Sequence, residues 1–190
     1  MMHFSQKTNT GFTLVEIIIV VFLFGAMLVG LLSIFEWQQK IYTVEMAEIR
    51  VTSDARSVIS NMNTFMAQGI EVVASRIIEG TEYTTGGGTV IVRLPVIVSG
   101  GDVLADQFDY VVFHRDGTFL KQIIEAHPSS IRDSGIRELS SSVHNFSLNF
   151  NSGNLPAVNR VDVAITNRAY YRGDKFIDFS LSHSIFLRNN

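Results

Sequence analysis

An apolar run begins at Phe12 and ends at Phe35, and Glu16 is the only charged residue within it. As a helix this run would rise about 36 Å, which exceeds the roughly 30 Å of a bilayer's hydrocarbon core. The pattern therefore predicts a membrane-spanning helix that carries one carboxylate near its start. Because an ionised carboxylate at membrane depth costs on the order of 3 kcal/mol or more, Glu16 is expected to have a partner. Trp37 and Tyr42 are amphipathic aromatics where the outer membrane interface is expected.

An amphipathic helical pattern follows the apolar run. Its apolar residues recur at spacings of three and four, which places them on one helical face. They are Ala55, Val58, Ile59, Met62, Met66 and Ile70. Gly69 is a natural stop, so one helix is predicted from Phe12 to near Gln68, about 85 Å long, with its second half packed on a sheet.

The rest of the chain is predicted to be mostly antiparallel β structure, because its apolar residues alternate with a period of two. Strands are expected at residues 71–78, 89–98, 107–114, 118–125, 146–150, 161–165 and 179–187. The expected fold class is therefore α+β, with a long N-terminal helix packed on an antiparallel sheet.

Connections between these strands are predicted from glycine, proline and aspartate. Residues 80–88, with three consecutive glycines, are expected to form a flexible hairpin connection, and Asp116-Gly117 a tight turn. Pro95 cannot donate to a ladder, which indicates an edge or a bulge. A loop is expected at residues 126–135 and a helical turn at residues 136–140.

The chain's 190 residues, net charge of −3 and lack of cysteine limit the classes of protein to which it can belong. Beyond the membrane segment there is room for about one domain. The acidic balance argues against a protein built around nucleic acid, and without cysteine there is no disulfide framework or thiolate metal site. The predicted parts are a leader at residues 1–11, a transmembrane half-helix at 12–35, an amphipathic half-helix at 36–70 and a β-rich head at 71–190.

The leader differs from an ordinary secretory signal. Residues 1–11 carry Lys7 and no acid, and they contain no apolar region of their own. A secretory signal would be cut after its apolar stretch, but no small-residue cleavage pattern follows Phe35. Cleavage is therefore expected before the apolar run, which would make Phe12 the first residue of the mature chain.

The sequence of residues 11–16, GFTLVE, resembles the signal of type IV pilins and pseudopilins. The resemblance implies cleavage between Gly11 and Phe12 by an inner-membrane prepilin peptidase, which also methylates the Phe12 amine. It further implies that Glu16 pairs with the Phe12 amine of a neighbouring subunit during filament assembly. Such a pairing is physically sound, because opposite charges that meet in a low dielectric relieve the cost that each bears alone.

Apolar patterns in the head are similar to those of the J-type minor pseudopilins of type II secretion and the W-type minor pilins of type IV pili. They are carried by Phe108, Tyr110, Asp116, Gly117, Thr118, Leu120, Leu139, Val143, Phe146, Leu148, Leu155, Pro156, Val158, Val161, Val163 and residues 185–189. The resemblance implies a single-pass protein of the cytoplasmic membrane, in contact with membrane lipid and with its head on the extracytoplasmic side. Its implied partners are other minor subunits, a major pilin and the inner-membrane assembly platform. Ser33 stands where many major pilins have proline, so the helix melting of that family is not carried over.

No enzyme and no cofactor are expected, because no catalytic constellation is present. His114-Arg115-Asp116 imitates a kinase triplet without the other kinase motifs, and the five histidines lack metal-ligand spacing. His183 alternates with apolar neighbours, which indicates a packed or edge histidine. Arg172-Gly173-Asp174 matches an adhesion tripeptide, but glycine and aspartate are expected in a turn.

Calcium and nucleic acid are not expected ligands. Asp102, Asp106 and Asp109 could supply oxygen ligands, but they lack a calcium-loop pattern and are predicted to be solvated acids. The basic residues of the head are scattered and do not form a stripe interleaved with aromatics.

The sequence thus favours an interaction protein, a minor pilin or pseudopilin that helps start or cap a helical filament. A tip subunit with a direct role in DNA uptake or adhesion stays open, as does a simple membrane-anchored exported domain.

Overall fold

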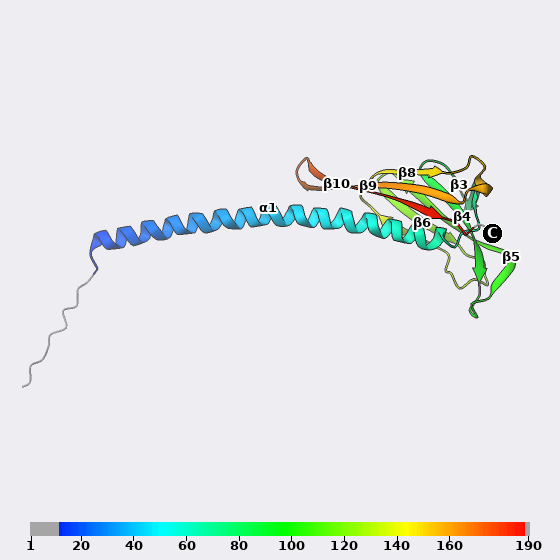
Figure 1. The fold of residues 1–190 in the computed structure, drawn as a ribbon. Helices are drawn as coiled ribbons and strands as arrows, with labels where there is room; N and C mark the ends of the chain where they lie inside the picture. Colours follow the sequence, from blue (N-terminus) through cyan, green and yellow to red (C-terminus); the bar gives the residue numbers. More distant parts are fainter. Residues whose placement is uncertain (1–11, 189–190) are drawn as a thin grey trace, which may run out of the picture. The chain divides into compact units, whose positions relative to one another are not determined.

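The computed structural model describes residues 12–188, which form one long α-helix and three antiparallel sheets. Two compact units divide the chain, one up to Thr43 and the other from Val44 onward. The helix packs against the sheets within the second unit, so the predicted α+β class is confirmed (Figure 1).

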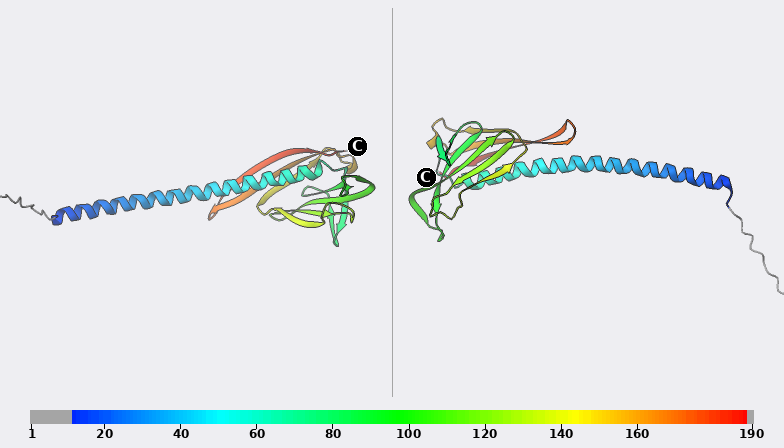
Figure 2. Two further views of the ribbon diagram at one scale, coloured as in Figure 1. Left: turned by 90° about the horizontal axis from the view of Figure 1, so that it is seen from below. Right: turned by 180° about the vertical axis from the view of Figure 1, so that it is seen from behind.

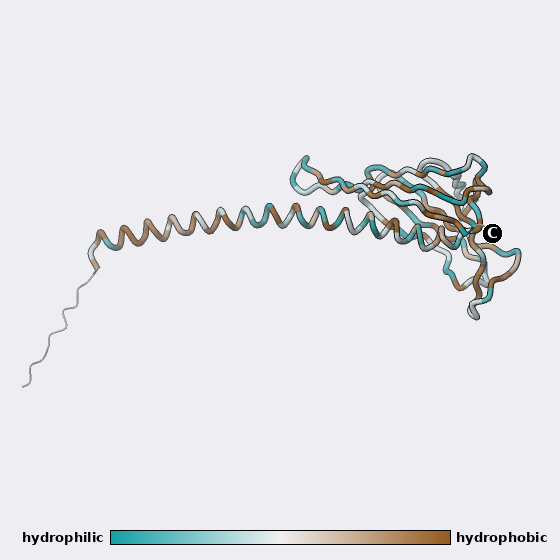
Figure 3. The backbone as a smooth tube through the Cα atoms, viewed as in Figure 1, coloured by the Kyte–Doolittle hydropathy of each residue, from teal (hydrophilic) through white to brown (hydrophobic). Residues whose placement is uncertain are grey.

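Helix α1 (Leu14–Met66) covers the apolar run and continues through the amphipathic stretch. Its start and end lie within two residues of the predicted bounds. The side chains of residues 14–40 are all exposed, and hydrophobic residues predominate there in Figure 3. Ser33 does not interrupt the helix, and its hydroxyl donates a hydrogen bond to the Val29 carbonyl at 3.0 Å.

The helix stops where the backbone meets the sheet. The Gly69 amide donates to the Met66 carbonyl at 2.9 Å, as in a closing turn. A side chain at position 69 would collide with a methyl group of Val92 and would lie 2.9 Å from the Met66 carbonyl oxygen. Glycine is therefore required there by close approach, which agrees with its prediction as a helix stop.

The predicted stripe on the second half of α1 forms the centre of the head's core. Its buried members are Ala55, Val58, Ile59, Met62 and Met66. Ala47 and Val51 are also buried on α1 but were not predicted, and they pack with Ala169 in a separate cluster. Ile70 was wrongly included, because it lies after the helix and is only half-buried. The stripe packs against apolar residues of β4, β5, β6, β8, β9 and β10, so one cluster joins the helix to two sheets.

The larger sheet has the strand order β1-β4-β5-β6-β7. Its strands are β1 (Glu71–Val73), β4 (Thr89–Ile97), β5 (Val103–Asp116), β6 (Phe119–Glu125) and β7 (Gly135–Ser140). The predicted helical turn at residues 136–140 is wrong, because this segment pairs with β6 as an edge strand. The register between β4 and β5 shifts after Pro95, which confirms the expected bulge.

A separate hairpin covers the outer face of this sheet. Strands β2 (Ser75–Ile78) and β3 (Thr81–Thr84) pair with each other, and Ile78 packs with Ile91, Val112 and Ile123. The single strand predicted at residues 71–78 is therefore two strands in different sheets. The predicted flexible connection at residues 80–88 contains β3, so only its last residues are a loop.

The smaller sheet has the order β10-β9-β8, and its strands follow the three late alternating runs. They are β8 (Val143–Phe150), β9 (Arg160–Arg172) and β10 (Lys175–Phe186), with a short 3-10 helix η1 (Leu155–Ala157) between β8 and β9. The hairpin of β9 and β10 extends beyond the other strands of this unit in every view (Figures 1 and 2).

Candidate functional site

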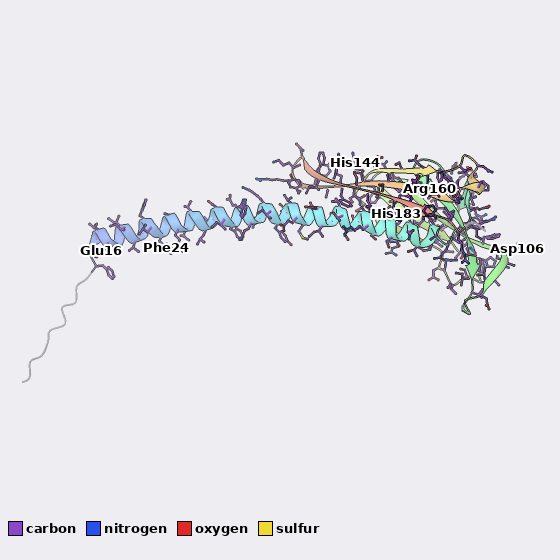
Figure 4. The ribbon with its side chains drawn as sticks, viewed as in Figure 1. Glu16, Phe24, Asp106, His144, Arg160 and His183 are labelled. Carbon is purple, nitrogen blue, oxygen red and sulfur yellow. The ribbon has the colours of Figure 1, made fainter. Side chains whose placement is uncertain are left out.

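Glu16 lies at the start of α1, where its carboxylate is held by Thr13 (Figure 4). The Thr13 amide and hydroxyl donate hydrogen bonds to Glu16 Oε2 at 2.8 and 2.9 Å. In return, the Glu16 amide donates to Thr13 Oγ1 at 3.3 Å. This reciprocal arrangement is a capping box, in which a threonine and an acid three residues later satisfy backbone donors of the first helical turn.

The capping box uses only one of the two carboxylate oxygens. Both bonds from Thr13 end on Oε2, and Oε1 accepts no hydrogen bond from residues 12–188. The positive end of the helix dipole also favours a negative charge at this position. The arrangement can therefore fix the side chain of Glu16 and leave one oxygen to meet a cation from outside the chain.

The segment around Glu16 has no internal packing. Phe12 is 83% exposed, and every described side chain up to Lys40 is classed as exposed. By length and composition, α1 contains a stretch able to cross a membrane. Because so many exposed apolar residues are unfavourable in water, this part of the chain needs lipid or other proteins around it.

The sequence-predicted site residues are only partly visible in the structure. Gly11 lies outside the described residues, whereas Phe12 lies two residues before α1 and Glu16 lies in its first turn. Cleavage after Gly11, methylation of Phe12 and pairing of Glu16 stay predictions. The role of Thr13 was missed, although the spacing of threonine and glutamate in a Thr-x-x-Glu pattern was a sufficient signal for a capping box.

Asp109 forms the principal buried polar cluster in the head. Its Oδ1 accepts the His127 amide at 2.7 Å, and its Oδ2 accepts the Ser130 hydroxyl at 2.7 Å and the Arg132 guanidinium at 2.6 Å. Asp109 is fully buried, so its prediction as a solvated acid is wrong. The same Arg132 also donates to Gln68 at 2.7 Å, which ties the loop after β6 to the end of the helix. The cluster is structural, because every partner comes from the chain itself.

The other motifs considered lie in turns and on edges. Asp116 ends β5 beside Gly117, and Gly173-Asp174 connects β9 to β10, as predicted for both. His183 is exposed on the edge strand β10. Within the described part of the chain, no group of three or more histidine or acidic residues could hold a metal ion.

A comparison with protein families finds that residues 6–32 match the prokaryotic N-terminal methylation motif. The matched region includes Gly11, Phe12, Thr13 and Glu16, and most of the apolar half of α1. No curated protein matches the chain.

Proposed function

We propose that this chain, for which the matched motif supports a type IV pilin-like protein, is a minor pilin or pseudopilin. The motif implies processing by a prepilin peptidase and assembly with other pilins, and it suggests a structural subunit rather than an enzyme. The finer proposal is that the subunit helps to initiate or cap the filament of a type II secretion system or a type IV pilus. Cleavage after Gly11 would free the Phe12 amine for methylation.

The observation that carries the proposal is the state of Glu16. Its position at the start of an unpacked apolar helix gives the carboxylate a high desolvation cost, and Thr13 satisfies only one of its oxygens. A Phe12 ammonium from a neighbouring subunit supplies the missing positive charge. The pair forms only when two chains are in register, so it can select the position of an incoming subunit.

The head supports the same role in a different way. Its core is formed by its own helix and sheets, and its buried charge is satisfied internally. A head of this kind can be carried into a filament as a preformed unit, without folding at the moment of assembly. Two further functions stay open, which are DNA uptake or adhesion at a filament tip and simple anchoring of an exported domain. Unlike the proposed function, neither requires Glu16 to pair with the Phe12 amine of a neighbouring subunit.

The test separates the charge of Glu16 from its capping bond. Glu16→Gln keeps an oxygen that can accept from Thr13 but removes the charge, whereas Thr13→Val removes the hydroxyl and keeps the charge. In the native host, we expect Glu16→Gln to stay in the membrane and to lose recovery of the other minor subunits by about 150-fold or more, since removing one partner of a buried pair commonly costs about 3–5 kcal/mol. Thr13→Val should keep most of that recovery.

Wild-type partner recovery and filament formation with both Glu16→Gln and Glu16→Leu would contradict the pairing. A membrane anchor, or a position at the very tip where no earlier amine is met, would then be the better account. Loss of membrane retention in the wild-type chain would contradict the membrane step itself.

A further inference from the structure

One polar residue interrupts the apolar row of β9 that packs with α1. Alternate side chains of this strand are apolar and buried up to Ile165. The next residue on the same face is Asn167, which is fully buried, and neither its amide nitrogen nor its amide oxygen has a hydrogen-bond partner among the described residues. An asparagine amide can donate two hydrogen bonds and accept two. Because a buried polar group without a partner is unfavourable, Asn167 weakens the packing at this point.

The interruption separates two apolar clusters. Ile165 belongs to the main core, which also contains Ala55 and the rest of the predicted stripe on α1. Ala169, the next residue after Asn167 on the same face, packs instead with Ala47 and Val51 in a small cluster. The small cluster is completed by partly buried residues of the hairpin, namely Tyr171, Ile177 and Phe179, of which Phe179 also packs against the main core.

The boundary between the clusters is polar on other elements as well. The Asp54 carboxylate on α1 accepts a hydrogen bond from the Ser142 hydroxyl at 3.1 Å. The Ser142 carbonyl accepts the amide of Arg168 at 2.8 Å, which places this group beside Asn167 on β9. Polar groups from α1, β9 and the connection before β8 therefore meet where the two clusters divide.

The sheet also changes at this level. β8 begins at Val143, which pairs with Asn167, and its register shifts between Val143 and Asn145. Among the described residues, β9 beyond this level pairs with β10 alone, so the extension of the hairpin seen in Figures 1 and 2 is a two-stranded ribbon. A two-stranded hairpin is marginally stable by itself. The position of the extension therefore depends on the small cluster.

We propose that the small cluster is a joint that opens as one unit while the main core stays closed. In the open state, the extension of the hairpin separates from α1 at Ala47 and Val51, and water reaches the amide of Asn167. Hydration of this amide offsets part of the apolar contact that is lost, so opening costs less than unfolding of the head. The joint goes beyond the proposed function and does not rest on it, because all of its residues lie in the unit from Val44 onward.

Opening changes the length of α1 that is held by the sheets. In the closed state, the first buried residue of the helix is Ala47. In the open state, the first buried residue is Ala55, which lies about 12 Å further along the helix axis, or about two turns. The joint thus lets the head release part of its helix without unfolding.

The experiment measures opening by the reactivity of single cysteines, since the chain has none of its own. Val51→Cys places a thiol in the small cluster of the full chain, held in detergent micelles. Val58→Cys is the matched control, because both valines are fully buried on α1 and Val58 lies in the main core. The rate of reaction with a water-soluble disulfide reagent is divided by the rate in urea. We expect Val51→Cys to react about 10-fold or more faster than Val58→Cys, since a locally opening site is reached without unfolding of the core.

A second substitution tests whether Asn167 is the cause. Asn167→Leu keeps a branched side chain and removes both polar atoms, so it should lower the rate at position 51 by about 10-fold. Thr166→Val is the control, because Thr166 is the adjacent residue on the opposite face of β9, where its hydroxyl bonds to Ser180. This variant should leave the rate at position 51 unchanged. Asn167→Val, which is closer to asparagine in volume, should act as Asn167→Leu does and decides the test if the leucine variant does not fold.

Two results would overturn the inference. The first is an equal rate at positions 51 and 58 in chains without further substitutions, since the two clusters would then open only together. The second is a rate at position 51 that does not fall with a folded Asn167 variant, which would show that opening does not expose Asn167.

Discussion

Two carboxylates mark the difference between the two parts of the chain. Asp109 is fully buried in the head, and its two oxygens accept three hydrogen bonds from the loop after β6. Glu16 is exposed, and among the described residues Thr13 alone binds it. The head pairs its buried carboxylate within the chain, whereas the apolar half of α1 leaves its side chains and one oxygen of its acid for other molecules to satisfy. Variants that act on one part and spare the other test this difference.

The largest effect is expected from Asp109. Asp109→Ala leaves Arg132, which is 11% exposed, without its counter-charge, and such a loss commonly costs about 3–5 kcal/mol. We expect the free energy of unfolding of the head to fall by about that amount, measured as urea unfolding followed by hydrogen exchange in β4 and β5. Glu16→Leu should leave the free energy of unfolding of the head unchanged. An equal fall in that free energy from both variants would contradict the proposed difference between the two parts of the chain.

Truncation of apolar side chains should separate the two halves of α1. Met62 is fully buried against the sheets, so Met62→Ala should destabilise the head by about 2–5 kcal/mol. Leu28 is exposed in the apolar half, and Leu28→Ala should not alter head stability. The check is the urea midpoint of both variants beside the wild type. A shift caused by Leu28→Ala would show that the apolar half supports the head.

Glycine substitutions should change the stability of the head by a smaller amount, and again only when the glycine lies in the head. Gly69→Ala puts a methyl group into Val92 and near the Met66 carbonyl, and overpacking of this kind costs about 1–3 kcal/mol. Gly25→Ala meets nothing within 4 Å, so the head should be unaffected. Thermal unfolding of the two variants checks this. An unchanged midpoint for Gly69→Ala would mean that the end of the helix can move away from β4.

The smallest effect is expected from an exposed pair. Arg168 donates two hydrogen bonds of 2.7 Å to Asp178 and lowers the pKa of that carboxyl. A carboxyl with a lowered pKa adds stability above its unfolded value of about 4, and this stability is lost as pH falls through the folded value. The difference in thermal midpoint between wild type and Asp178→Asn should therefore shrink below about pH 4. A difference that is constant from pH 3 to pH 7 would show that the pair's charge contributes nothing.

Local patterns predicted the elements that depend on local physics. The length of α1, its buried stripe and the alternation in β8, β9 and β10 follow from residues close together in the chain, and the structure confirms them. The turn at Asp116-Gly117 belongs to the same class, since Gly117 adopts a positive φ of 61°.

The errors arose where pairing with distant residues decides the structure. Residues 136–140 have no clear alternation, and they form β7 only because β6 offers an edge. Residues 71–78 divide because β1 pairs with β4, whereas β2 pairs with β3. The burial of Asp109 depends on Arg132, which no spacing in the sequence links to it. In the candidate site, the short motif singled out Phe12 and Glu16, whose roles stay predictions, and the capping of Glu16 by Thr13 could also have been predicted from it.

The most direct test of the central claim is the intact mass of the chain recovered from the native membrane, with fragmentation of its N-terminus. The account predicts a mature chain that begins at Phe12 and carries a single methyl group on its amine, because Gly11 and Phe12 lie within the matched N-terminal methylation motif. A mature chain that begins at any other residue would contradict the claim. A Phe12 amine without methyl, in a host with active peptidase, would contradict the methylation step and leave the cleavage in place.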